Sequence, residues 1–156
     1  MTGKRILFIA PQPFFEVRGT PIAVRDMLNV LNNKFEIDLI TYPFGIKLNI
    51  KNVNHFRCWG LGFRDVAIGP SLKKIILDLS LLIMAIQRIL KNKYVVIHAV
   101  EEAGIIAVLL KKISQSKFVY DMDSIMSEQV KKKNYRIVES VFLFIEKKII
   151  QHSDLI

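Results

Sequence analysis

The loop at residues 11–20 holds the residues best suited to bind an anion. It follows the apolar run Arg5–Ala10 and ends in Arg18-Gly19-Thr20, where a helical pattern begins. Free N–H groups and the helix dipole at a helix N-terminus suit a phosphate, and glycine lets a ligand approach the backbone closely. Arg18 adds a charge-assisted contact. The alternative is that Gly19 serves only a turn, since neither a GxGxxG nor a Walker sequence occurs.

Two further candidates for chemistry lie at residues 98–102. His98 is expected to end a second buried strand, where an imidazole suits binding of a substrate hydroxyl or proton transfer. The alternative is a structural histidine held by hydrogen bonds. Glu101 and Glu102 open the next helical pattern, and acidic side chains stabilise a helix start without any catalysis. One of them also remains a candidate for binding substrate hydroxyls.

A pair of carboxylates, Asp121 and Asp123, follows a third apolar run. Paired carboxylates perform acid–base chemistry or hold Mg²⁺. However, Asp123 or Ser124 is also a natural N-cap for the helical pattern that follows. Capping accounts for at least one of the pair and is favoured here over catalysis, although Asp123 is retained with His98 as a catalytic candidate. No metal or cofactor is expected.

Strands and helices alternate along the chain, and this alternation predicts how the three loops are positioned. Pro21 and Ser71 mark two helix starts, with Thr20 and Ser71 as the caps. The strands are expected at Arg5–Ala10, Phe35–Tyr42, Val53–Cys58, Tyr94–Ala99 and Lys117–Asp121, and the helices at 20–33, 71–91, 101–113, 125–132 and 135–152. The pattern predicts one α/β domain over residues 1–156, with a doubly wound, mainly parallel, Rossmann-like sheet in three α/β/α layers. In such a sheet the loops after the strands share one crevice.

Composition narrows the class of protein. With 156 residues, 51% of them hydrophobic, the chain can fill a core and is not disordered. Asp78, Gln87 and Arg88 interrupt the longest apolar stretch, which therefore predicts a helix of a globular domain and not a membrane-spanning one. The single cysteine, Cys58, excludes an internal disulfide and a multi-cysteine metal site, and fits a cytoplasmic protein.

The net charge of +9 favours anionic partners. Its basic residues occur in pairs near predicted helix ends, which indicates solvated helix faces or, alternatively, a patch that binds the inner surface of a membrane. Nucleic acid is not expected as a partner, because no DNA- or RNA-reading motif accompanies the charge.

Four segments fall together in a known order and spacing: RILFIAPQPFFEVRGTPIAVRDMLNVL, YVVIHAVEEAGIIAVLL, KFVYDMDSI and IEKKIIQHSDLI. In these segments, which together extend over nearly all of the chain, the sequence resembles the N-terminal half of a GT-B-type glycosyltransferase of the group-1/family-4 kind. Members of that family are retaining enzymes that act on nucleotide-activated sugars.

The resemblance implies roles for the candidate residues. The loop at Arg18-Gly19-Thr20 corresponds to the glycine-rich loop that faces the donor diphosphate, residues 98–102 to the lining of the acceptor crevice, and residues 121–124 to a loop that often contains a substrate-contacting histidine. Two residues depart from the pattern: Arg18 replaces the first glycine of the usual pair, and Asp123 replaces that histidine.

The resemblance also implies a second domain, which holds most of the nucleotide-sugar in this family. No residues follow Ile156 to supply it, so we expect the acceptor-side half of an enzyme whose C-terminal domain is absent or belongs to a partner chain, and no transferase activity from this chain alone. The complete enzyme would move a sugar to a hydroxyl acceptor in glycan, glycolipid or cell-envelope biosynthesis. The alternative is a non-catalytic binding module that docks on an anionic membrane or on a partner chain. A dinucleotide-binding domain is disfavoured because no glycine fingerprint follows the first strand.

Overall fold

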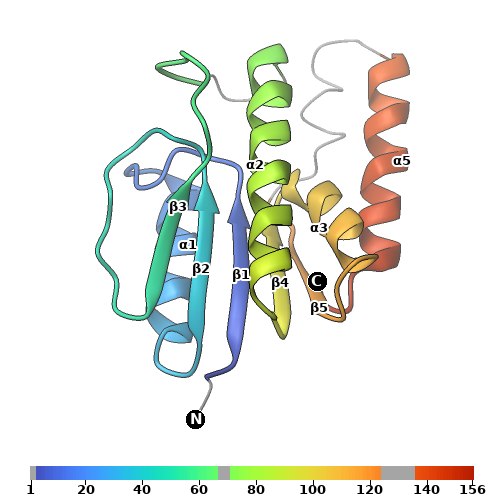
Figure 1. Ribbon diagram of the computed structural model, residues 1–156. Coiled ribbons are helices and arrows are strands. Elements are labelled where there is room, and N and C mark those ends of the chain that lie inside the picture. The colour runs from blue at the N-terminus through green and yellow to red at the C-terminus, as the bar shows by residue number, and fades with distance from the viewer. Residues whose placement is uncertain (1–2, 67–70, 124–135) are drawn as a thin grey trace.

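Five parallel strands form the central sheet of the computed structural model, which describes residues 3–66, 71–123 and 136–156 (Figure 1). The strands are β1 (Arg5–Ala10), β2 (Glu36–Thr41), β3 (Val53–Arg57), β4 (Val96–Val100) and β5 (Lys117–Asp121). Their order in the sheet is β3-β2-β1-β4-β5, so the direction of winding reverses between β1 and β4. This confirms the predicted doubly wound, Rossmann-like α/β fold.

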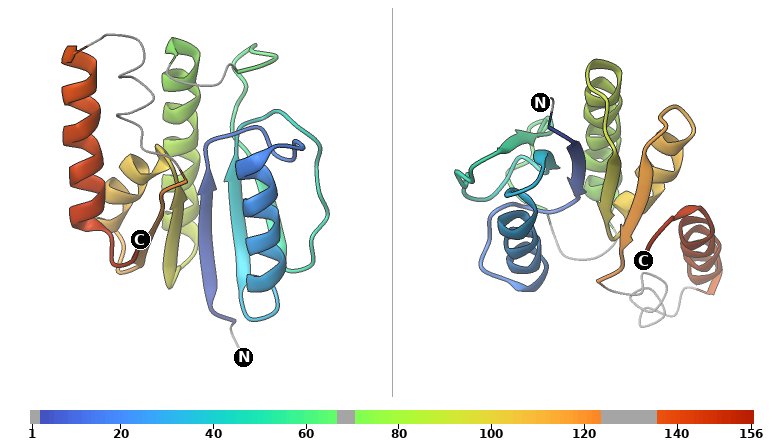
Figure 2. Two further views of the ribbon diagram at one scale, coloured as in Figure 1. Left: turned by 180° about the vertical axis from the view of Figure 1, so that it is seen from behind. Right: turned by 90° about the horizontal axis from the view of Figure 1, so that it is seen from below.

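Helices cover both faces of the sheet. Within the described residues they are α1 (Gly19–Leu31), α2 (Leu72–Lys91), α3 (Ala103–Lys111) and α5 (Arg136–His152). The helix α1 covers one face, whereas α2 and α3 cover the other and α5 packs beside α3 near β5 (Figures 1 and 2). The sheet and its two helical layers give the expected three-layer arrangement.

The central strand β1 explains why two separate cores form. Its apolar run is buried on both faces, and successive side chains point to opposite sides of the sheet. Phe8 therefore packs with Val24 and Leu28 under α1. Leu7 and Ile9 instead pack under the opposite layer, in a larger cluster that reaches α2, α3 and α5.

Most of the predicted elements are confirmed, with ends that differ by one or two residues. Ser71 caps α2 as expected, because its side-chain oxygen accepts a hydrogen bond from the Lys74 N–H at 3.2 Å. The predicted Thr20 cap is wrong. The helix α1 starts two residues earlier than this cap implies, with Arg18 at the N-cap position and no capping side chain, and the Thr20 hydroxyl instead donates to Asp123. The expected helix at 125–132 and the candidate cap Ser124 lie outside the described residues.

The chain turns after α5 and meets the edge of the sheet. Leu155 forms an isolated parallel bridge with Val119 of β5. Among the described residues, no helix is long and apolar enough to cross a membrane.

Candidate functional site

The three predicted loops follow β1, β4 and β5, three neighbouring strands of the sheet. All strands are parallel, so these loops emerge at the same edge, at the top of Figure 1. The loops after β1 and β4 flank the point where the strand order reverses, which is where ligands bind in open α/β sheets.

A hydrogen bond joins the first loop to the third. Thr20 Oγ1 donates to Asp123 Oδ2, so the carboxylate lies at the N-terminus of α1. The first hydrogen bond of α1 runs from the Ile22 N–H to the Arg18 carbonyl oxygen at 3.1 Å. The backbone N–H groups of Gly19 and Thr20 precede it and have no partner within the helix. The Arg18 side chain lies beside them and forms an ion pair with Glu16 at 3.3 Å.

Gly19 has no structural need to be a glycine. Its backbone does not adopt a positive φ, and a Cβ atom added there would meet no other atom within 4 Å. The alternative that Gly19 serves only a turn therefore finds no support in the geometry. The open space in front of its backbone is what the close approach of a ligand requires.

His98 lies inside β4, two residues before its end, and not at the strand end as expected. Its ring stacks on Phe8 of the neighbouring strand, with centroids 4.2 Å apart and planes 12° from parallel. The side chain therefore faces the α1 layer, and it is 8% exposed. His98 Nε2 is 3.4 Å from Asp121 Oδ2. This carboxylate can fix the orientation of the imidazole.

The two glutamates of the second loop have different surroundings. Glu101 adopts a positive φ of 48°, which is uncommon for a residue with a side chain. Its N–H donates to the Asp121 carbonyl oxygen at 3.0 Å, so the second and third loops are tied together. Glu102 instead forms an ion pair with Lys74 of α2, on the opposite face of the sheet from His98. The structure thus brings the predicted residues together with the exception of the Glu102 carboxylate.

A second polar cluster, the Asp78 cluster, lies between α2 and the sheet on the same face as the Glu102 ion pair, and the sequence did not reveal it. Tyr42, just after β2, donates a hydrogen bond to Asp78 of α2 at 2.5 Å. Burial raises the pKa of Asp78 to about 7, although the Tyr42 hydrogen bond opposes this shift, and burial also raises the pKa of the Tyr42 hydroxyl. The signal in the sequence was a lone aspartate inside an apolar helix, which predicted only an interruption of the apolar run.

Gln12 is another residue that the sequence did not single out. It lies in the first loop and is 5% exposed. Its backbone carbonyl oxygen accepts a hydrogen bond from the Tyr42 N–H. Within the described residues its side-chain nitrogen finds no hydrogen-bond partner. A buried amide without a partner is costly, so this nitrogen is a candidate donor to a bound ligand.

The described residues contain no group of three or more histidine, cysteine, aspartate or glutamate side chains placed to hold a metal ion. Asp121 and Asp123, the carboxylates considered for Mg²⁺, turn to different partners, His98 and Thr20. The thiol of Cys58 is buried beneath α2, and burial raises its pKa to about 11.

No family model matches the chain, and no curated protein matches its sequence. Among solved structures, it is similar to a sucrose-phosphate synthase from Thermosynechococcus elongatus, with a TM-score of 0.74 and 15% sequence identity. The two proteins share a fold. The match covers 97% of this chain and 41% of that enzyme, so the chain spans less than half of its length. The likeness shows a shared α/β fold over this chain and does not extend to a particular family.

Proposed function

We propose that the chain is the N-terminal, acceptor-side domain of a cytoplasmic, retaining glycosyltransferase of the group-1/family-4 kind. The enzyme would move a sugar from a nucleotide-sugar to a hydroxyl acceptor in glycan, glycolipid or cell-envelope biosynthesis. The observation that supports this most is the hydrogen bond between Thr20 and Asp123, because it unites two predicted substrate loops at the carboxyl edge of the sheet. A second domain would supply most of the nucleotide binding, so this chain is expected to be inactive alone.

The first loop would stabilise the leaving diphosphate. Charge develops on this group as the glycosidic bond to the donor breaks, and preorganised donors at that place lower the barrier. The N–H groups of Gly19 and Thr20 and the Arg18 guanidinium would supply such donors without a metal ion. Gln12, with its unpartnered side-chain nitrogen, would add a donor from the same loop.

The second and third loops would orient the acceptor. Asp121 would hold the His98 imidazole so that one ring atom is available to an acceptor hydroxyl. Asp123 would accept a hydrogen bond from a second hydroxyl, from its position at the start of α1. Glu101 would bind a further hydroxyl, whereas Glu102 would keep its ion pair with Lys74 and act on substrate only if that pair opens.

The role of the first loop can be tested with the whole chain and nucleoside diphosphates. In ¹H–¹⁵N spectra, UDP, GDP or ADP should shift the amide signals of Gly19 and Thr20. Gly19→Ala should fold as well as the wild type, because open space surrounds the new methyl group, and yet bind the diphosphate more weakly. Arg18→Ala should weaken binding about tenfold through the loss of a charge-assisted hydrogen bond.

Lys34→Ala is the matched control, because this exposed cation follows α1 at the opposite end of the helix. If Lys34→Ala weakens binding as much as Arg18→Ala, the diphosphate responds only to the net charge and the proposed site is wrong. No response of any amide in the first loop would favour the alternative of a non-catalytic binding module. Turnover of a nucleotide-sugar by this chain alone would refute its expected inactivity.

A further inference from the structure

The outer face of α2 is apolar over most of its length, with the exposed Gln87 as a polar interruption between Ile83 and Leu90. Five side chains lie on one stripe of the helix because they are spaced three, four or seven residues apart. They form what we call the apolar ridge: Leu72, Ile75, Leu79, Ile83 and Leu90, which are between 41 and 76% exposed. A surface helix ordinarily places charged or polar residues on this side, and a large exposed apolar patch marks an interaction surface.

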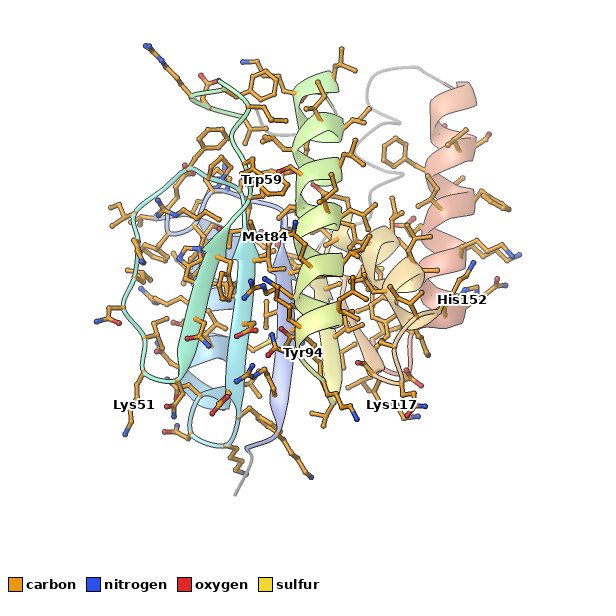
Figure 3. The ribbon with its side chains drawn as sticks, viewed as in Figure 1. Lys51, Trp59, Met84, Tyr94, Lys117 and His152 are labelled. Carbon is orange, nitrogen blue, oxygen red and sulfur yellow. The ribbon has the colours of Figure 1, made fainter. Side chains whose placement is uncertain are left out.

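The ridge does not belong to the protein's own core. The opposite side of α2 already packs there, through Leu77, Leu81 and Ala85, all fully buried. Figure 3 views α2 from its outer side, where the side chains along the helix carry mostly carbon atoms. The neighbouring helix α3, in the same layer, adds the exposed Ile105 and Leu109.

Trp59 lies beside α2 (Figure 3). Two hydrogen bonds fix its backbone to the helix: its N–H donates to Ser80 Oγ at 2.9 Å, and the Ser80 hydroxyl donates to its carbonyl oxygen at 3.2 Å. The side chain remains 47% exposed. A partly exposed indole beside an apolar surface suits the boundary between lipid and water.

Cations frame the ridge at both ends. Lys91 and Lys93 follow its last residue, and Lys112 ends the adjacent α3; all three are exposed, and none forms an ion pair within the described residues. Lys73 lies at the other end and pairs with Asp65 at 3.1 Å. The end of the apolar surface at Lys91, Lys93 and Lys112 therefore favours a negatively charged partner.

The shape and charge select the partner. The ridge is the convex side of a helix and not a groove that holds a segment of protein. A second copy would bring one net charge of +9 against another, and this repulsion opposes self-association. An anionic bilayer attracts the same charge and admits leucine and isoleucine side chains at its surface.

We propose that the apolar ridge docks the protein on an anionic lipid bilayer. The helix α2 would lie in the plane of the interface, with the ridge in the headgroup–acyl boundary and the terminal lysines near lipid phosphates. The helix starts near the carboxyl edge of the sheet (Figure 1), so docking by its outer face leaves that edge uncovered. This proposal does not rest on glycosyl transfer.

Vesicle binding tests the proposal, and Trp59, the only tryptophan of the chain, is its reporter. Vesicles of equal parts phosphatidylglycerol and phosphatidylcholine should sediment with the wild-type protein and shift the Trp59 emission to shorter wavelength. Leu79→Glu with Ile83→Glu should reduce binding about tenfold or more, since two apolar side chains no longer enter the lipid. Vesicles of phosphatidylcholine alone should bind more weakly.

Asn29→Glu with Val30→Glu is the matched control, because it adds two carboxylates at exposed positions of α1, on the other face of the sheet. Equal losses in the two double variants would overturn the proposal, since only net charge would then matter. The proposal would also be overturned if the wild-type protein did not bind the vesicles. It would likewise be overturned if sedimentation velocity showed a dimer that Leu79→Glu with Ile83→Glu converts to a monomer. Circular dichroism checks that each variant folds. If Leu79→Glu with Ile83→Glu does not fold, Leu79→Ser with Ile83→Ser takes its place.

Discussion

At the scale of single residues, the partly buried Asp78 is the most consequential titratable group outside the candidate site. Its carboxyl lies between α2 and the sheet, and burial raises its pKa from the usual value of 3.8 to about 7. Glu102 raises the pKa further by repulsion, whereas the Tyr42 hydrogen bond and Lys74 lower it. The folded protein therefore holds a proton on Asp78 over a range of pH in which the unfolded chain has lost it.

This difference makes the stability depend on pH. Between pH 4 and pH 7, unfolding releases the Asp78 proton, so the contribution of this residue to the free energy of unfolding falls as the pH rises. Above pH 7 the loss is complete and levels off. We expect Asp78→Asn to gain stability relative to the wild type across this window, by about 2–4 kcal/mol. Urea unfolding at a series of pH values measures the gain.

The pH dependence of stability that Asp78 causes must be separated from that of His55. Burial lowers the pKa of His55 to about 4, so the contribution of His55 to the free energy of unfolding rises with pH below 6.5. The difference between Asp78→Asn and the wild type cancels the His55 contribution, which both proteins share. Adding Tyr42→Phe to Asp78→Asn should leave the shape of the pH profile unchanged. A difference that stays constant from pH 4 to pH 8 would show that Asp78 ionises normally.

The residues of the site show what a sequence reveals at this scale. Arg18, His98 and Asp121 could be grouped because each lies near the end of a strand or in the loop that follows one, and these loops meet at one edge of a parallel sheet. The partner of Glu102 could not be predicted, because Lys74 comes close to it only once α2 has carried the chain across the sheet from β3 to β4. Helix-start chemistry predicted capping by Thr20, but a tertiary contact with Asp123 took the hydroxyl instead.

At the scale of elements, α3 is the helix most tightly confined. It connects β4 to β5 and packs against both strands as well as α2 and α5. Small buried residues, Ala103, Gly104 and Ala107, form its inner face, which allows this close approach. Its start was predicted two residues too early because Glu101 adopts a positive φ, which the helical pattern of the sequence cannot reveal.

Gly104 is the position where this packing can be tested. A Cβ atom there would lie 2.6 Å from Ile149 Cγ2 of α5 and 3.0 Å from the Tyr120 ring of β5. Alanine has the higher helix propensity, by about 1 kcal/mol, but overpacking a filled core costs about 1–3 kcal/mol. We therefore expect Gly104→Ala to destabilise the protein by about 1–2 kcal/mol, measured by urea unfolding.

A double-mutant cycle supplies the control. Ile149→Ala removes the methyl group that would clash, so the double variant should be less destabilised than the sum of the single changes. Gly19→Ala provides the contrast in an open site, where only the gain in propensity remains. A Gly104→Ala variant as stable as the wild type would show that α3 can move away from α5.

At the scale of the whole molecule, the two faces of the sheet have separate properties. The α1 face contains His98, Asp121 and the Thr20–Asp123 contact, whereas the α2 face carries the Asp78 cluster and the apolar ridge. The fold class followed from alternating apolar runs, but this division did not. The division depends on which face of the sheet each side chain near a strand end points to. A shift of one residue along a strand moves these side chains to the opposite face.

The final turn of the chain connects three elements, and Asp154 makes the connections. Its carboxylate accepts hydrogen bonds from Lys111 Nζ of α3 at 2.7 Å, from Lys117 Nζ at 3.3 Å and from the Phe118 N–H of β5 at 2.8 Å. These partners, led by Lys111, hold the pKa of Asp154 well below its usual range. The folded state thus stabilises the ionised form at neutral pH.

Asp154→Asn should lower the melting temperature at pH 7 by a few degrees, because an amide loses the charge that three donors share. The depressed pKa means that the contribution of Asp154 is present above pH 4 and is lost as the pH falls further, so the gap between variant and wild type should narrow in acid. Lys111→Met should reproduce part of the loss. Lys112→Met, which alters the exposed neighbour, should not. If the two lysine variants had equal effects, the turn would be held by general attraction to a basic helix end. The specific contact of Asp154 with Lys111 would then not be what fixes the chain after α5 against β5.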